Sequence, residues 1–180
     1  KPIVFTNNDS AYETAIEFKK NGIDPIVLDT RAESNSEIVK EAKNLNINIK
    51  FSYVVVSAKG YKKVKSADIA KISNDKKELS NIENINCDCI CVSGFWTPTI
   101  HLASQSGNKT KFNEEIDAFI PSQSKQKETT LGSAKGLFTL EETLKTSFQK
   151  GNELSKQITN KENKISVPGV VEKKSSKHDK

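Results

Sequence analysis

The chain has 180 residues, of which 34% are hydrophobic and 28% are charged, and its formal net charge is +5 at pH 7. This length accommodates one domain, or one domain with part of another. No apolar run approaches the roughly 18 to 20 residues that a membrane-spanning helix needs. Lysines are spread along the chain without interleaved aromatic residues, so we expect no nucleic-acid binding. Three cysteines within five positions form no disulfide framework, and a cytoplasmic location is expected.

Both ends of the sequence suggest part of a longer protein. The chain begins with Lys1 and contains no methionine, whereas a primary translation product begins with one. Because the first residues lead directly into an apolar run, we expect an internal fragment. Residues 158–180 are rich in Lys and Ser and poor in apolar side chains, which predicts a linker or a disordered tail.

The first part of the chain predicts a β-α-β unit of about 30 residues, the size of a parallel crossover. Residues 2–5 are an apolar run typical of a buried strand. Turn and N-cap formers follow at residues 6–10, and a helix face then extends to Lys20 and ends before Gly22. Residues 26–28 form the second strand.

The following segment predicts further α/β structure. A second helix begins at Ser34 or Asn35, and a third strand covers residues 47–51. Two β-like runs, residues 53–57 and 61–72, are joined by a hairpin-type turn. A hairpin inserted after β-α-β-α-β, followed by one more strand, is a common layout of the small dinucleotide domain in two-domain flavoproteins.

The remainder is more varied. Residues 74–86 are polar and predict a loop, and residues 87–92 predict a buried strand. Residues 113–119 predict a short helix or a loop, and residues 121–130 an exposed polar segment. A helix that can extend to residue 157 is expected from residue 140 to residue 151, because Leu140, Leu144 and Phe148 recur at helical spacing.

The first crossover lacks the usual signature of a nucleotide site. A dinucleotide-binding turn needs G-x-G-x-x-G so that the backbone can approach a pyrophosphate. The turn from Thr6 to Ser10 contains no glycine, and Asp9 places a carboxylate where the phosphate would lie. Asp29 does lie roughly 20 residues on, where an acid would bind a ribose. We favour a Rossmann-like unit that has lost its ligand, with a working pyrophosphate site as the alternative.

The strand with three cysteines and the loop after it are the next candidates. Cys87, Cys89 and Cys91 alternate along the predicted strand and share one face. Core packing is favoured over a soft-metal or redox site, so no metal is expected. Trp96 and His101 can line a pocket, but His101 has no paired acid or nucleophile. We therefore favour a packed crossover here and expect no catalytic residue.

The small-residue loop before the last helix is the most ligand-like segment. Small residues allow backbone N–H groups to face an anion at a helix N-terminus. The candidate cofactor-binding residues are Gly132, Ser133, Ala134, Gly136, Phe138 and Leu140.

Three runs together resemble one family. VFTNNDSAYETA at the start, CDCICVSGFWTPTIHLASQSG in the middle and LGSAKGLFTLEETLKTSFQKG near the end are similar, in order and spacing, to the alpha subunit of heterotetrameric sarcosine oxidase. The resemblance extends from about Pro2 to Gln157. The family usually has Gly-Gly-Trp-Thr-Pro in the middle loop, where this chain has Phe95 in place of the second Gly.

The resemblance implies an α/β fold built from two parts. Residues 1–86 would be a smaller, Rossmann-like domain with an inserted β-hairpin, like that of pyridine nucleotide-disulfide oxidoreductases. Residues 87–157 would be the returning C-terminal part of a larger FAD/NAD(P)-binding-type domain. The Gly-rich turn would lie before Lys1, and the loop from Gly132 to Leu140 would contact the bound NAD.

The resemblance also implies an activity for the whole complex. The family oxidatively demethylates sarcosine to glycine, forms hydrogen peroxide and passes the one-carbon unit to tetrahydrofolate on a downstream domain. FAD and FMN act elsewhere in the complex, and the partners are the beta, gamma and delta subunits. This segment would support NAD binding and assembly and be inactive alone. Two alternatives stay open: an FAD-binding piece of another amino-acid or opine-type dehydrogenase, and a ligand-free Rossmann-like scaffold.

Overall fold

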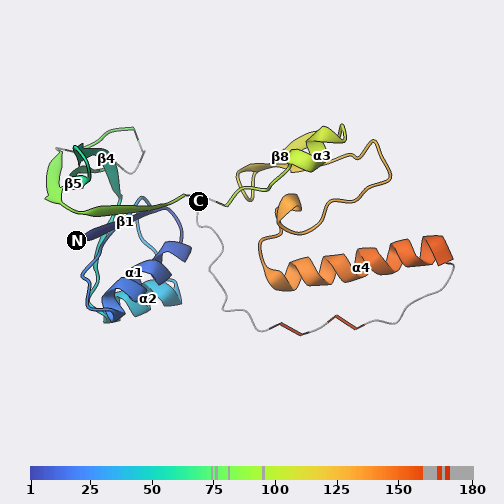
Figure 1. Cartoon of the computed structure of the whole chain (residues 1–180), viewed down its shortest axis with the longest axis horizontal. Coiled ribbons are helices and arrows are strands. Elements are labelled where there is room, and N and C mark those ends of the chain that lie inside the picture. Colours follow the sequence, from blue (N-terminus) through green and yellow to red (C-terminus); the bar gives the residue numbers. More distant parts are fainter. Residues whose placement is uncertain are drawn as a thin grey trace. The chain divides into compact units, whose positions relative to one another are not determined.

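The computed structural model describes residues 1–73, 75, 77–80, 82–94, 96–159, 166–167 and 169–170. The chain divides into two compact units, the first ending at Phe95 and the second beginning at Trp96. Figure 1 shows the elements of each unit along the chain. Within the ranges just given, no helix combines the length and the apolar character needed to cross a membrane.

A parallel sheet of four strands, in the order β3-β2-β1-β7, forms the centre of the first unit. Thr6 at the end of β1 is paired with the last residues of both neighbouring strands. The chain proceeds outward from β1 to β3 and later returns to β7, so the topological switch point lies between β1 and β7. The strands are β1 (Pro2–Thr6), β2 (Ile26–Asp29), β3 (Asn48–Phe51) and β7 (Cys89–Ser93).

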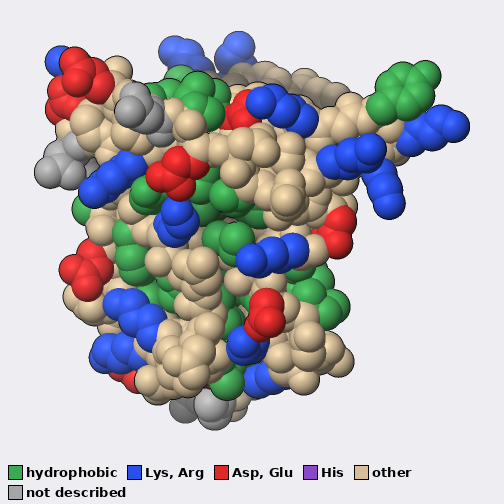
Figure 2. Space-filling model, turned by 90° about the vertical axis from the view of Figure 1, so that its left-hand side faces the viewer, with side chains coloured by type: hydrophobic (Ala, Val, Ile, Leu, Met, Phe, Trp, Pro, Cys, Tyr) green, Lys and Arg blue, Asp and Glu red, His purple; other side chains and the backbone are tan. Residues whose placement is uncertain are grey.

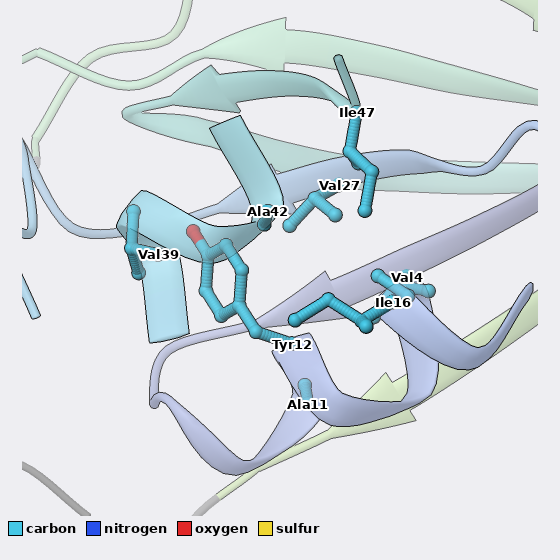
Figure 3. Packing of buried hydrophobic residues seen from close by; sticks show 9 residues of the cluster. Val4, Ala11, Tyr12, Ile16, Val27, Val39, Ala42 and Ile47 are labelled. Carbon is cyan, nitrogen blue, oxygen red and sulfur yellow. The ribbon is translucent and has the colours of Figure 1, made fainter. Parts of the chain in front are cut away.

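Two helices cover one face of this sheet: α1 (Ser10–Lys20) and α2 (Glu37–Asn44). β1 and β2 are apolar throughout their centres, as parallel strands buried on both faces require. Figure 3 shows the Tyr12 side chain reaching from α1 toward Val39 and Ala42 of α2. This packing fixes the start of α1, and with it the turn that follows β1.

The other face of the parallel sheet is covered by an antiparallel sheet in the order β4-β5-β6. Figure 1 draws β4 and β5 on the opposite side of β1 from α1 and α2. Ala67 and Ile69 of β5 are fully buried and pack against Ile3 and Leu28 of the parallel sheet. The strands are β4 (Tyr53–Gly60), β5 (Val64–Lys71) and β6 (Glu83–Asn86). On the face shown in Figure 2, Lys and Arg side chains are interspersed with Asp and Glu.

The second unit combines a hairpin with helical segments. Phe112 and Phe119 face each other across the hairpin with their ring centroids 5.3 Å apart, while Ala118 and Ile120 are buried. The last helix has no fully buried side chain. The elements are α3 (His101–Gln105), β8 (Thr110–Asn113), β9 (Ala118–Pro121), the 3-10 turn η1 (Gly132–Lys135) and α4 (Leu140–Thr159).

Several local predictions are wrong. The predicted loop at residues 74–86 ends in β6, which pairs with β5. Ile85 is the one apolar residue of β6, so the hydrophobic pattern of this strand does not predict a strand. The segment predicted as a helix or loop at residues 113–119 is the turn and second strand of the β8–β9 hairpin. The cysteine strand is not buried throughout, because β7 has β1 as its one described neighbour and Val92 is 69% exposed.

The boundary between the two parts also differs from the expected one. β7 pairs with β1 along its whole length, so the first unit continues through Phe95 instead of ending at Asn86. α4 extends to Thr159, and the rest of the predicted tail, apart from residues 166–167 and 169–170, lies outside the described residues. Phe95, which departs from the family pattern, also lies outside them.

Candidate functional site

The carboxyl edge of the parallel sheet, at its switch point, is where an open α/β sheet normally binds a ligand. Here the turn after β1 is closed by its own polar groups. The Thr6 hydroxyl donates to the carbonyl of Asn8 at 2.9 Å and accepts from the Asn8 backbone N–H at 3.1 Å. This turn therefore makes the hydrogen bonds that a glycine-rich turn would leave available for a phosphate.

Asn8 also bridges the two strands of the switch point. Its side-chain nitrogen donates to the carbonyl of Gly94 and, at 3.3 Å, to the hydroxyl of Ser93, both at the end of β7. Its side-chain oxygen accepts from the backbone N–H and the hydroxyl of Ser10, at 3.1 and 2.6 Å. Because Asn8 is only 4% exposed, this crevice is occupied by a protein side chain.

A buried charge network lies at the same edge, beside the ends of β1 and β2. Arg31 contacts Asp29 through two nitrogens, with Nη2 2.8 Å from Oδ2 and Nε 3.1 Å from Oδ1. The same Nη2 lies 2.8 Å from Oδ1 of Asp9. The Tyr12 hydroxyl donates to Asp29 Oδ2 at 2.7 Å. One guanidinium thus joins the N-cap residue of α1 to the last residue of β2.

The protonation states of this network follow from burial and from the Asp29 charge. Burial, reinforced by the nearby Asp29 carboxylate, raises the pKa of Tyr12 far above its ordinary value. Burial disfavours the charged form of Arg31, but the hydrogen bonds and the negative charges of Asp29 and Asp9 together outweigh that cost and raise its pKa. Tyr12 therefore stays a neutral donor and Arg31 a cation at any physiological pH.

This arrangement is unsuited to a dinucleotide. Both oxygens of Asp29, the residue expected to bind a ribose, are engaged by Arg31 and Tyr12. The carboxylate of Asp9 is 5% exposed, and its Oδ2 has no hydrogen-bond partner. A pyrophosphate here would meet two carboxylates and one guanidinium that is already paired. The geometry favours the hypothesis of a Rossmann-like unit without a ligand at this edge.

Sequence reasoning missed the central residue of this network. Asp9 and Asp29 were both singled out, but only the fold brings them to opposite sides of Arg31. The spacing of Asp29 and Arg31, two residues apart at the end of a strand, is the one local signal that would have pointed to their pairing.

The small-residue loop of the second unit forms η1 and the approach to α4. Gly132 and Gly136 both have positive φ, at +64° and +85°, a conformation that favours glycine. A Cβ on Gly136 would lie 2.6 Å from Ile116 Cδ1, so this glycine also permits close packing against the hairpin turn. The N–H groups of Gly136 and Leu137 donate to carbonyls within the loop.

The N-terminus of α4 is capped by the protein itself. The Thr139 hydroxyl accepts from the backbone N–H of Glu142 at 3.2 Å and donates to its carboxylate at 2.8 Å. Glu141 and Glu142 place negative charge in the first helical turn, where the helix dipole favours it. An anion would therefore be bound beside this helix start and not directly on it.

A polar groove of about 390 Å³ adjoins the loop. Within the described part of the chain Lys135 makes no ion pair, whereas Lys150 pairs with Glu153 at 2.7 Å. Lys135 and the hydroxyls of the groove offer groups that an anionic, hydrogen-bonding ligand requires. The groove is lined by Asn108, Pro121, Ser122, Ser124, Glu128, Thr129, Thr130, Leu131, Lys135, Thr146, Gln149, Lys150 and Glu153.

None of the six predicted cofactor-binding residues lines this groove. They lie in the segment that adjoins it, and their neighbours Leu131 and Lys135 do line it. Gly132 is buried, whereas Ser133 and Leu140 are exposed. Trp96 and His101 are likewise exposed and do not line it.

The three cysteines do not share one environment. Cys87 is 4% exposed and packs with Ile3 and Ala67, and burial raises the pKa of its thiol. Cys91 is half-buried against the other face, which likewise raises its pKa, and Cys89 is exposed. The prediction that the cysteines pack in the core therefore agrees with the structure for Cys87 and in part for Cys91, but not for Cys89.

The fold is similar to that of reductases of known structure. Bacillithiol disulfide reductase from Staphylococcus aureus matches 83% of this chain and 51% of its own, with a TM-score of 0.56 and 14% identity. Thioredoxin reductase from Lactococcus lactis matches 75% of this chain and 44% of its own, with a TM-score of 0.58 and 16% identity. These likenesses concern the fold alone, and they confirm the predicted fold class.

By sequence, the chain is similar to sarcosine oxidase subunit alpha. The protein of that name from Corynebacterium sp. (strain P-1) is 27% identical over 151 residues, which are 83% of this chain. That from Rhizobium meliloti (strain 1021) is 27% identical over 135 residues. The matched region spans 15% and 12% of these two relatives, respectively. No family model matches the chain.

Proposed function

We propose that this chain is a segment of the alpha subunit of a sarcosine oxidase-type oxidoreductase, and that it supports dinucleotide binding and subunit assembly. The observation that carries the proposal is the similarity to sarcosine oxidase subunit alpha over 83% of the chain. The whole complex would demethylate sarcosine oxidatively to glycine, form hydrogen peroxide and pass the one-carbon unit to tetrahydrofolate. Its other parts would be the beta, gamma and delta subunits, with FAD and FMN.

Within this chain, we assign the dinucleotide contact to the second unit. The carboxyl edge of the first unit is filled by Asn8 and by the Arg31 network, and the described residues of this edge offer no unpaired cation. The groove beside η1 does offer one, Lys135, together with hydroxyl groups. NAD is the expected ligand, and Gly132, Ser133, Ala134, Gly136, Phe138 and Leu140 are the residues proposed to lie near it.

A second candidate is an FAD-binding segment of another amino-acid or opine-type dehydrogenase. The fold favours it equally, because the reductase likenesses do not distinguish the two dinucleotides. The third candidate is a ligand-free scaffold. The filled edge of the first unit supports this candidate for the first unit.

Nucleotide analysis of the native complex distinguishes these candidates. The complex is purified from its source and denatured, and the released nucleotides are identified by chromatography and mass spectrometry. NAD together with flavins supports the sarcosine oxidase proposal. FAD without NAD favours the second candidate, and no nucleotide at all favours the scaffold.

A variant then tests the loop itself. Ser133→Asp adds a negative charge beside the proposed pyrophosphate, and Ser104→Asp adds the same charge at an exposed position of α3 in the same unit. Two charges about 4 Å apart near a protein surface repel by several kcal/mol before screening. We expect at least tenfold lower NAD occupancy in the intact complex for Ser133→Asp alone. Equal occupancy in both variants would remove the loop from the NAD site.

A further inference from the structure

Cys89 and Cys91 form a pair of thiols on the edge strand β7. Their sulfurs lie 3.8 Å apart, where either thiol can donate a hydrogen bond to the other, and Cys91 packs on the face of the sheet that α1 and α2 cover. Both are free, and Cys89 is exposed to solvent. The third cysteine, Cys87, packs on the other face of the sheet and does not join the pair.

The separation of the two sulfurs suits one kind of ligand. A Zn²⁺ ion bonds to thiolate sulfur at about 2.3 Å. An ion at that distance from two sulfurs 3.8 Å apart has an S–Zn–S angle of about 111°, close to the tetrahedral value. A linear, two-coordinate ion with bonds of that length would need the sulfurs about 4.6 Å apart.

A disulfide fits the same pair less well. Residues i and i+2 of an extended strand are separated by about 6.6 to 6.8 Å, from a rise of about 3.3 to 3.4 Å per residue. Disulfides usually have Cα–Cα distances of about 4.4 to 6.8 Å, with a mode near 5.5 to 6 Å. The strand thus holds Cys89 and Cys91 near the upper limit, where sharing an ion requires less backbone movement than forming a bond.

We propose that Cys89 and Cys91 bind a soft, tetrahedral divalent ion of the Zn²⁺ and Cd²⁺ type. Thiolate ligands select such ions over Mg²⁺ or Ca²⁺. Among the described residues no group of three His, Cys, Asp or Glu side chains is placed to hold a metal, so the proposed site has two ligands from this part of the chain. The exposure of Cys89 leaves the other two positions to water. This proposal is independent of the proposed function.

Cadmium is the probe for this site, because thiolate-to-Cd²⁺ charge transfer absorbs in the ultraviolet. Cd²⁺ is titrated into the reduced chain in the presence of a phosphine reductant, which supplies no competing thiol. We expect one Cd²⁺ per chain, with both thiol protons displaced. Excess Zn²⁺ should remove the absorption by competing for the same sulfurs.

Three matched variants decide the assignment. Cys89→Ser and Cys91→Ser should each weaken Cd²⁺ binding at least tenfold, while Cys87→Ser should bind as the unchanged chain does. Cys89 is exposed, so its variant should fold normally, which circular dichroism verifies even if Cys91→Ser unfolds. An absorption that persists in Cys89→Ser, or one that depends equally on Cys87, would overturn the proposal.

Discussion

Replacing Arg31 by methionine should strongly destabilise the first unit. Methionine keeps much of the apolar length of the side chain but removes the charge that faces Asp29 and Asp9. Those carboxylates have 0% and 4% of their side-chain surface exposed, so solvent cannot replace the lost partner. Removing one member of a buried ion pair typically costs about 3 to 5 kcal/mol. Because this guanidinium serves two carboxylates, we expect a loss of about 4 kcal/mol.

Hydrogen exchange with mass spectrometry measures this loss in each unit separately. Each 1.4 kcal/mol corresponds to a factor of about ten, so protection of the β1 and β2 amides should fall by about three orders of magnitude. Amides of the second unit should be unaffected. Lys19→Met is the matched control, because it breaks the exposed pair with Asp24, and such pairs contribute about 1 kcal/mol or less.

The reasoning about Arg31 would be refuted if Arg31→Met lowered protection no more than Lys19→Met does. Arg31→Lys should fall between the two, because it keeps the charge but cannot contact Asp29 through two nitrogens and Asp9 at the same time. A lysine variant as stable as the unchanged chain would show that charge alone matters, and not the geometry of the guanidinium.

Two further predictions concern stability. Gly136→Ala should destabilise the second unit by about 1 to 2 kcal/mol, because a left-handed conformation disfavours a Cβ and the new Cβ would also meet Ile116. Urea unfolding measures this loss. Gly22→Ala is the control, because Gly22 has φ +78° with open space around it, so this variant shows the backbone contribution to the loss without the steric one. The hydrogen bond from Lys59 lowers the pKa of Asp68 to about 2 from an ordinary value of 3.8. The stability that this ionised carboxyl contributes is therefore lost as the pH falls from about 4 to about 2, and Asp68→Asn should remove that part of the pH dependence of thermal unfolding.

The parts of the fold predicted from the sequence are those with a strong hydrophobic pattern. β1 and β2 are apolar runs, and α1, α2 and α4 carry apolar residues at helical spacing, so each is found where expected. β6 has a single apolar residue and becomes a strand because β5 offers an edge to pair with. The β8–β9 hairpin likewise depends on the contact of Phe112 with Phe119, which local periodicity cannot reveal.

The candidate sites likewise have some features that local sequence predicts and others that depend on the fold. The absence of glycine between Thr6 and Ser10 predicts a turn that does not cradle a phosphate, because that requirement is local. The contacts that fill the crevice are not local: Asn8 reaches residues 93 and 94, and Asp9 meets Arg31, which follows the neighbouring strand β2. Such contacts depend on the sheet order, which places β7 beside β1.

The first unit illustrates how a nucleotide-binding topology is kept stable when its edge is filled. In a dinucleotide domain, a pyrophosphate supplies negative charge at the N-terminus of the first crossover helix. Here the N-cap residue of that helix, Asp9, carries the negative charge, and Arg31 connects it to Asp29 at the adjacent strand end. The same strand ends and helix start are therefore held together by side chains alone. Because the network already provides both charges, we expect that introducing glycine in the turn alone would not create a nucleotide site.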